Sequence, residues 1–414
     1  MKSNTGNYLI LFFLCLIIST AILCYDRSLT EHYASYRQSD FNAFEWDSRT
    51  LWRLKPSYHG TAFETEIDTS AQGFRADRIY PLKSEHKFRI LTLGDSRTYG
   101  FNVNHDETFS SVLEQTLKEQ GIDAEVINAG VHGFSAVQCL AYFRELLKFC
   151  PDIVIFAPGY NDRRYLIVRS PDNPAAFRNL ALVRSLSDFI QQSNLLFGLL
   201  NKIGKTKMRE LQYHPPPLDT VPVRVEPETF QHSVQDFVSL CRQNNVSPIF
   251  LAIEQNPLVY EEVEEGIRLH RAGEYQASNT LLIEALPDLY RCAQTLCRYT
   301  IGMNYIALGD SEQAKSWFAE HQPIPSIFGQ FVLRSQEPYL NTLQSVAEQK
   351  QIPLVSARGA IEAAAPHDET PQQFFASTFV DECHFNAVGH RCMGKALADT
   401  VYDLLHRMDT GASF

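Results

Sequence analysis

The residues ILTLGDSRTYG (90–100) join a short apolar segment to a turn that contains a serine. The apolar residues are typical of a buried β-strand, and Gly94 permits backbone angles that a β-branched residue would resist. We therefore expect Ser96 just beyond the carboxyl end of a strand, where ligands bind in open α/β sheets. Taken alone, Gly-Asp-Ser is more typical of a plain turn and helix N-cap, so its role depends on the rest of the chain.

Short apolar segments alternate with helical patterns along the chain. The five segments with strand character are RILTL (89–93), AEVIN (124–128), DIVIF (152–156), SPIFLAI (247–253) and IPLVS (352–356). An amphipathic helix is expected after them, from about Asn386 to Arg407. This alternation predicts an α/β fold with a five-stranded parallel sheet and crossover helices.

The N-terminal residues 7–25, NYLILFFLCLIISTAILCY, carry no charge. Their length is close to that which spans the hydrocarbon core of a bilayer, so we predict a retained transmembrane signal-anchor after a short tail, residues 1–6. A cleaved signal peptide and a buried core helix are the alternatives. Lys2 marks the short side as the inner one. The body of the protein, beginning with a juxtamembrane stalk and entry segment over 26–87, is then expected on the extracytoplasmic side, either periplasmic or extracellular.

The composition excludes some classes of protein. A length of 414 residues suggests two or three folded units. The formal net charge is −11, and no segment clusters lysine and arginine, so a nucleic-acid partner is not expected.

The nine cysteines do not indicate a disulfide framework. Two lie in the apolar N-terminal segment, and the seven in the body leave at least one thiol unpaired within a monomer. Cys292 and Cys297 are close enough in sequence to pair in an oxidising compartment, but separate buried thiols are an equal alternative. No Cys-x-x-Cys or His-x-x-x-His spacing occurs. We therefore predict no metal and no cofactor.

Roughly 95 residues separate the last two strand segments, far more than a usual connection. Within them, small and aromatic positions recur after 36 residues, in the pairs Gly266 and Gly302, Gly273 and Gly309, Ser278 and Ala314, and Leu282 and Phe318. These positions resemble the tetratricopeptide helix-turn-helix. We predict a tetratricopeptide-like helical insert over 257–322 that leans on the main domain, since two repeats fall short of a stable stack. An ordinary pair of helical hairpins is the alternative.

The insert would divide the main domain into a first part, 88–256, and a second part, 323–414. All the residues with expected chemistry lie outside the insert. We therefore expect it to recruit a protein partner or to shape access of the substrate, and to supply no catalytic group.

Polar residues follow several of the predicted strands and precede the last helix. The segments are GDS (94–96), INAG (127–130), APGYND (157–162) and VDECHFNAVGH (380–390). In this chain order they resemble blocks I, II, III and V of the SGNH (GDSL) hydrolase family, over most of 88–165 and 340–405. The resemblance implies a flavodoxin-like three-layer α/β/α sandwich, with Ser96, Gly130, Asn161 and His384 as the named residues of the blocks.

The residue types suit acyl transfer. A serine hydroxyl is a weak nucleophile and needs a base, which His384 can provide because imidazole titrates near neutral pH. Asp381 can accept the other ring N–H and orient the imidazole. The resemblance assigns the oxyanion donors to the backbone N–H groups of Ser96 and Gly130 and to the side-chain amide of Asn161.

The resemblance implies a serine ester hydrolase that acts on a small-molecule or carbohydrate ester, and the apolar segment 7–25 predicts that this enzyme is membrane-anchored. The expected reaction removes an acyl group, with acetyl as one candidate, from a carbohydrate of the cell envelope. An O-acetyltransferase that acts on an extracellular polysaccharide and a non-catalytic scaffold that uses the helical repeats are the alternatives. Arg97, Arg163 and Arg164 either contact an anionic or sugar substrate or are solvated.

Overall fold

The computed structural model describes residues 19–22, 24–27, 43–47, 49–62, 65–81, 83, 87–163, 223–256, 261–288, 291–319 and 336–409. Five strands form one parallel sheet in the order β6-β5-β7-β8-β9. They are β5 (Phe88–Gly94), β6 (Ala124–Gly130), β7 (Ile153–Ala157), β8 (Ser247–Ala252) and β9 (Leu354–Ser356). The predicted five-stranded parallel sheet is therefore confirmed. Gly94 pairs with both Gly130 and Ala157, so the carboxyl ends of the three adjacent strands lie side by side.

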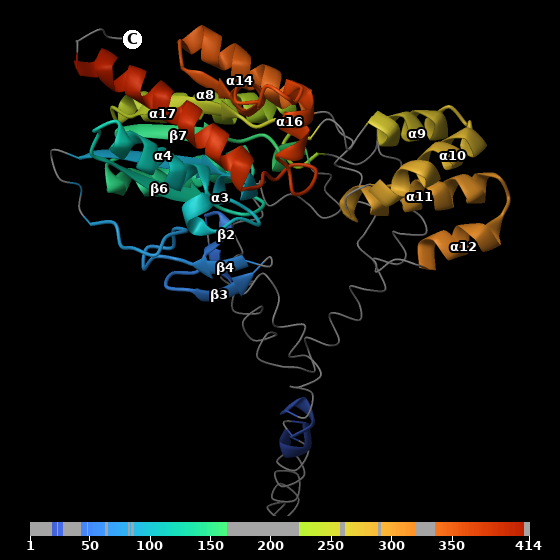
Figure 1. Ribbon diagram of the computed structural model, residues 1–414. Helices are drawn as coiled ribbons and strands as arrows, with labels where there is room; N and C mark the ends of the chain where they lie inside the picture. The colour runs from blue at the N-terminus through green and yellow to red at the C-terminus, as the bar shows by residue number, and fades with distance from the viewer. Residues whose placement is uncertain are drawn as a thin grey trace, which may run out of the picture.

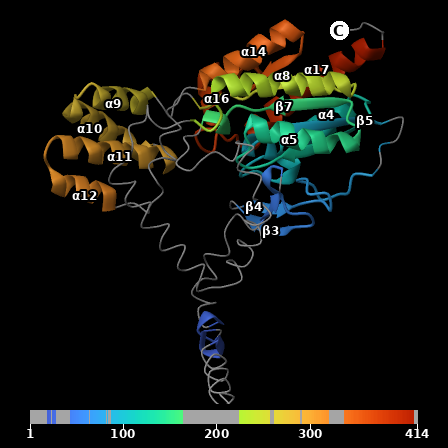
Figure 2. The same cartoon turned by 180° about the vertical axis from the view of Figure 1, so that it is seen from behind.

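Helices cover both faces of this sheet (Figures 1 and 2). One face carries α5 (Ala136–Leu146), α8 (Pro227–Gln243) and α14 (Glu337–Lys350). The other carries α4 (Phe109–Glu119), α15 (Ala357–Ala363), α16 (Pro371–Ser377) and α17 (Ala387–Asp409). Leu91 and Leu93 of β5 point into the first layer and Ile90 into the second, as strand alternation requires. The architecture is a three-layer α/β/α sandwich.

Single helical turns connect several of these elements. They are α3 (Ser96–Tyr99) and the 3-10 turns His105–Glu107, Leu147–Phe149, Asn161–Arg163 and Leu286–Asp288.

The segment predicted as a stalk contains two antiparallel hairpins. They are β1 (Phe44–Asp47) with β2 (Leu51–Leu54), and β3 (His59–Ala62) with β4 (Thr65–Asp68). Leu54 and Ile67 form a small core with Tyr99 of α3, and Trp52 Nε1 donates to the carbonyl of His132 at 2.8 Å. The described part of this segment is therefore packed onto the main domain.

The chain between β8 and β9 forms a helical unit beside the sandwich (Figure 1). Its helices are α9 (Glu261–Arg271), α10 (Tyr275–Ala285), α11 (Arg291–Ala307) and α12 (Ser311–Ala319). A Cβ added to Gly266 would lie 2.4 Å from Leu282, and one added to Gly302 would lie 2.5 Å from Phe318. Each glycine lets two helices approach closely, as the sequence repeat predicts; the tetratricopeptide assignment itself stays a prediction.

Most of the predicted anchor, 7–25, lies outside the described residues, which include helical pieces at 19–22 and 24–27. Within the described ranges, no helix is long and apolar enough to cross a membrane. Cys297 is a buried free thiol, and the side chain of Cys292 lies outside the described set.

Candidate active site

Ser96 begins helix α3 directly after β5. Asp95 caps this helix, because its Oδ1 accepts the backbone N–H of Arg97 at 3.0 Å. A Cβ on Gly94 would lie 2.2 Å from Thr98 Oγ1 and 2.8 Å from the Ala157 carbonyl, so only glycine permits this tight turn. The N–H of Ser96 occupies the first position of the helix, where no intrahelical acceptor exists.

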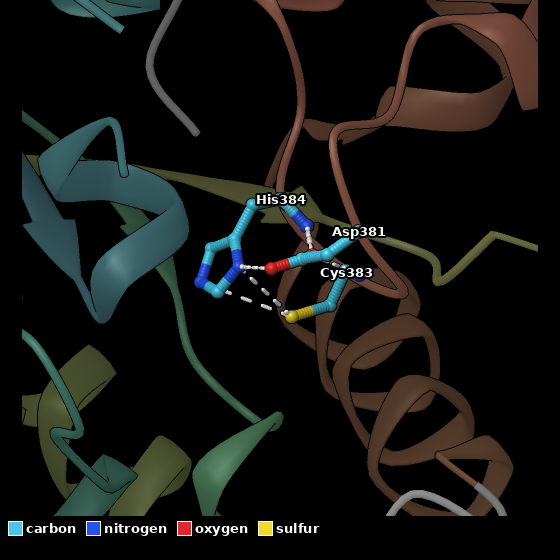
Figure 3. A group of neighbouring side chains, drawn as sticks. All are labelled: Asp381, Cys383 and His384. Atoms are coloured by element: carbon cyan, nitrogen blue, oxygen red, sulfur yellow. Dashed lines mark hydrogen bonds and ion pairs between the residues drawn. The ribbon is translucent and has the colours of Figure 1, made fainter. Parts of the chain in front are cut away.

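Three side chains form a continuous hydrogen-bonded chain. Ser96 Oγ lies 2.7 Å from His384 Nε2, although the two residues are 288 positions apart. His384 Nδ1 lies 2.6 Å from Asp381 Oδ2 (Figure 3). The Phe101 ring stacks on the imidazole with 4.3 Å between ring centroids. The structure thus brings together Ser96, His384 and Asp381, the three residues predicted as catalytic.

The loop that carries Asp381 and His384 holds the carboxylate in place. Asp381 Oδ1 accepts the backbone N–H groups of Cys383 and His384 at 2.8 and 2.7 Å. Burial opposes ionisation of Asp381, but the charge of His384, the bond to its ring and the two backbone bonds outweigh this effect and lower the Asp381 pKa. Asp381 is therefore a carboxylate that can accept the ring N–H.

The protonated form of His384 is favoured by its surroundings. Burial would lower the His384 pKa, but the charge and hydrogen bond of Asp381 and the nearby Glu382 and Asp95 carboxyl groups raise it above the ordinary value. Burial, followed by the charge of Asp381, raises the pKa of Glu382. The site can therefore stabilise the imidazolium that forms when His384 takes the serine proton.

Asn161 begins a buried 3-10 turn in the loop that follows β7. Its Nδ2 is buried and has no hydrogen-bond partner among the described residues. A buried amide without a partner is costly unless a ligand completes its bonding. Asp162 fixes the turn, because its carboxylate accepts the backbone N–H groups of Ala136 at 2.8 Å and Gly159 at 3.2 Å. These features suit an oxyanion donor.

The structure does not favour Gly130 as the predicted oxyanion donor. Its N–H donates to Asn128 Oδ1 at 3.0 Å, and a Cβ added to it would lie 2.2 Å from Tyr99 N. Gly130 therefore permits close packing of β6 on α3, and its N–H is already engaged. Gly133 is the better candidate donor. It lies in the following turn with φ of +74°, and its N–H has no partner among the described residues.

The turn that holds Gly133 is linked to His384 through the ring of Phe101. The ring of His132 packs edge-on against Phe101, which stacks on His384. The sequence signal for this second glycine is its place in the turn after the strand, within the segment VHGF (131–134).

Arg97 and Arg163 are buried, so the solvated alternative was wrong for both, and contact with a substrate stays a prediction. Arg97 donates to both oxygens of Asp95 at 3.0 Å and to the carbonyl of Ile253 at 2.7 Å. Both guanidinium groups lie over the ring of Tyr160, at 4.8 Å for Arg97 and 4.5 Å for Arg163. Arg164 lies outside the described residues.

Asp381, Cys383 and His384 also place one ligand atom each within 4.8 Å of one another. Both ring nitrogens of His384 already bond within the triad. Burial, followed by the charges of Asp381 and Glu382, raises the Cys383 pKa well above its ordinary value, which disfavours the thiolate that a metal prefers. The triad accounts for this group, and the expectation of no metal stays a prediction.

Comparison with known proteins points to one family. Residues 92–246 match the model of the GDSL-like Lipase/Acylhydrolase family. An arylesterase from Vibrio mimicus is 34% identical over 80 residues, which are 19% of this chain and 40% of that protein. The match therefore spans only two fifths of that relative.

Three solved structures are similar to the chain at low sequence identity. LAE5, an alpha/beta hydrolase enzyme from the metagenome of Lake Arreo, Spain, has 14% identity and a TM-score of 0.39, covering 75% of this chain and 94% of its own. TesA has 12% identity and a TM-score of 0.37, covering 76% and 99%. The psychrotrophic esterase EstA from Pseudoalteromonas sp. has 11% identity and a TM-score of 0.35, covering 77% and 98%.

The chain is therefore similar to the GDSL-like Lipase/Acylhydrolase family over residues 92–246, and to part of one arylesterase. Ser96 and Asn161 lie within the matched range, whereas Asp381 and His384 lie beyond it. The structure brings the two parts of the chain together, because His384 Nε2 lies 2.7 Å from Ser96 Oγ.

Proposed function

We propose that this protein is a serine ester hydrolase that works through an acyl-Ser96 intermediate. The observation that carries the proposal is the Ser96–His384–Asp381 chain, with distances of 2.7 and 2.6 Å between bonded atoms. This is the geometry in which a base activates a hydroxyl nucleophile while a carboxylate orients the base. The buried, unpartnered amide of Asn161 supports an oxyanion site beside it.

The reaction begins when Ser96 Oγ attacks the ester carbonyl carbon and its proton passes to His384 Nε2. The oxyanion of the tetrahedral intermediate accepts hydrogen bonds from the Ser96 N–H and from Asn161 Nδ2. The intermediate collapses, the departing alcohol takes the proton from His384, and the acyl group stays on Ser96. Water then gives a proton to His384 and attacks the acyl carbon. The second tetrahedral intermediate collapses, His384 returns the proton to Ser96 Oγ, and the carboxylic acid is released.

The natural substrate that we propose is a small acyl ester, such as an acetyl ester, on a carbohydrate of the cell envelope. The uncharged segment 7–25 supports this proposal, because a signal-anchor would hold the enzyme at the membrane with its body on the extracytoplasmic side. The paired helices of the insert support tetratricopeptide-like repeats that bind a protein partner.

The test measures turnover of nitrophenyl acetate, butyrate and octanoate by the full chain in detergent. Ser96→Ala should lower kcat by about 10⁴-fold or more, because it removes the nucleophile, and should leave Tm unchanged. Ser239→Ala, on the exposed side of α8, is the matched control and should keep the wild-type rate. A fluorophosphonate should label wild-type protein at Ser96 alone.

Wild-type turnover in Ser96→Ala would refute the proposal. Adding acetylated and unacetylated oligosaccharides separates the two enzymatic readings. Release of free acetate would support the hydrolase. Transfer of acetyl to a sugar hydroxyl would instead show that the protein is an O-acetyltransferase.

A further inference from the structure

One hydrophobic cluster, which we name the insert–loop cluster, joins the helical insert to the catalytic loops. Its insert members include Val263 and Ile267 of α9, Leu282 of α10 and Ile301 of α11. Its members from the sandwich are Tyr160 and Cys383. Both are buried, with 2% and 1% of their surface exposed. The core of the insert is therefore continuous with two residues of the main domain.

These two residues adjoin two members of the catalytic centre. Tyr160 directly precedes Asn161, and Cys383 directly precedes His384. The cluster therefore includes the residues that directly precede the candidate oxyanion donor and the candidate base.

Tyr160 is also held from the side of the sandwich. The guanidinium groups of Arg97 and Arg163 lie 4.8 and 4.5 Å from the centroid of its ring. Arg97 is itself fixed by Asp95, the residue before the nucleophile, and by the carbonyl of Ile253 at the end of β8. Displacement of Tyr160 would therefore disturb the turn of Asn161 and the contacts of a buried arginine beside Ser96.

Cys383 touches the base directly. Its Sγ lies 3.5 Å from His384 Nδ1 and 3.8 Å from Nε2 (Figure 3). Its backbone N–H donates to Asp381 Oδ1 at 2.8 Å. The thiol thus fills the space beside the imidazole, and its main chain helps to hold the carboxylate that orients the ring.

We propose that the helical insert is a structural part of the catalytic centre, with Tyr160 and Cys383 as positioning residues that fix Asn161 and His384. The inference rests on the proposed function for its catalytic consequence. Catalytic groups on loops keep a productive geometry only when packing around them restricts their movement. Here the insert supplies that packing from a chain segment that contributes no reacting group.

The first test is made on the full chain with two substitutions inside the insert. Ile267→Ala removes side-chain volume from the insert–loop cluster, whereas Ile267→Val restores most of it. Phe318→Leu perturbs a second cluster, formed with Tyr299 and Ala314, which includes no catalytic-loop residue. We expect Ile267→Ala to lower kcat by about ten-fold with KM within about two-fold, because displaced groups lose rate before binding.

The controls separate positioning from general stability. Ile267→Val should return kcat close to wild type, and Phe318→Leu should keep the wild-type kcat even where its Tm falls as far as that of Ile267→Ala. Equal kcat in Ile267→Ala and wild type, or an equal loss in Phe318→Leu, would overturn the proposal.

The second test stays informative if Ile267→Ala does not fold. Cys383→Ala should lower kcat and shift the apparent pKa of the pH–rate profile, because it removes the sulfur beside the imidazole. Cys241→Ala removes a buried thiol from α8, far in sequence from the triad, and should change neither value. An unchanged profile in Cys383→Ala would count against its positioning role.

A readout without turnover keeps the two proposals distinct. The proton between His384 Nδ1 and Asp381 should give a low-field NMR signal in wild type that weakens in Ile267→Ala and persists in Phe318→Leu. If wild type shows no ester turnover while the signal differs between these variants as expected, the proposed function is refuted and the positioning role is not. Persistence of the signal in Ile267→Ala would sink the positioning role alone.

Discussion

His384 uses both edges of its ring, so its orientation has little freedom. Nε2 bonds Ser96 and Nδ1 bonds Asp381, while Phe101 stacks on one face. Rotation of the ring would break both hydrogen bonds at once. The tautomer is therefore set by Asp381, which accepts from Nδ1 and leaves Nε2 to accept the serine proton.

The first prediction at this scale concerns pH. The pKa of His384 is raised above the ordinary value of 6.5, and the residue must be neutral to act as a base. We expect kcat/KM on a neutral ester to be low in acid and to rise through one apparent pKa above 6.5. Asp381→Asn should move this pKa downwards and lower kcat by about 10⁴-fold, because the ring loses its anionic acceptor.

The control for this prediction is Asp368→Asn, which removes an exposed carboxylate elsewhere in the same half of the chain. Its profile should match that of the wild type. A profile that is flat from acid to neutral pH would exclude His384 as the base.

Sequence reasoning at the level of single residues was strongest for side-chain chemistry. Ser96, Asp381 and His384 were identified by residue type and chain order, and the structure brings them together. The structure does not favour the role predicted for Gly130, because the sequence does not show which acceptor a backbone N–H meets. Which acceptor it meets depends on the packing of β6 against α3.

At the scale of elements, helix α3 is held at both ends. Asp95 caps its start, and the guanidinium of the buried Arg75 donates to the carbonyls of Tyr99, Gly100 and Val103 at and beyond its end. Arg75 belongs to the segment after the N-terminal hairpins, so that segment helps to fix the nucleophile.

Helix α17 is tied to α4 through a buried histidine, which leads to a prediction about acid stability. The backbone N–H of Phe109 donates to His390 Nδ1 at 3.2 Å. Burial, followed by the charges of Arg75 and His384, lowers the His390 pKa to about 3. In the unfolded chain this histidine binds a proton below about pH 6.5, whereas in the folded protein it stays neutral down to about pH 3. The free energy of unfolding therefore falls as the pH drops through that range.

The expected contribution of His390 is a loss of up to about 1.4 kcal/mol per pH unit in the free energy of unfolding. His390→Asn keeps an acceptor near Nδ1 but cannot titrate, so its urea-unfolding curves should depend less on pH between about 6.5 and 3. His406→Asn, at an exposed position of α17, should retain the wild-type dependence. Identical slopes for wild type and His390→Asn would contradict the assignment.

At the scale of the whole molecule, two appended units contact the loops of the site. Trp52 of the N-terminal hairpins bonds the turn that contains Gly133, and the insert shares a core with Tyr160 and Cys383. Figure 2 shows the insert beside the edge of the sandwich from the opposite direction. The loops of the candidate site therefore contact both a segment that precedes the main domain and one that interrupts it.

The prediction at this scale concerns the segment 7–25. Full-length protein should sediment with membranes, and protein lacking residues 1–25 should not, because only the longer chain carries the uncharged apolar stretch. Both should hydrolyse a water-soluble ester at the same kcat. Full-length Ser96→Ala is the control and should sediment like wild type. Recovery of full-length protein in the soluble fraction would refute the anchor.

Local sequence patterns were sufficient for the sheet and for the order of its loops. Alternation of apolar strands and helices predicted five parallel strands, and residue type placed Ser96, Asn161 and His384 at strand or helix boundaries. Such features follow from hydrophobic periodicity and turn chemistry, which act over a few residues. For that reason they can be read along the chain.

Only the tertiary structure decided which groups meet. It buried Arg97 and Arg163, engaged the N–H of Gly130 and joined the insert to Tyr160 and Cys383. None of these contacts follows from local pattern, because each depends on the strand order and on how elements far apart in the chain pack. The sequence by itself determined the chemistry available to the site, and long-range packing determined which of its donors and supports reach the serine.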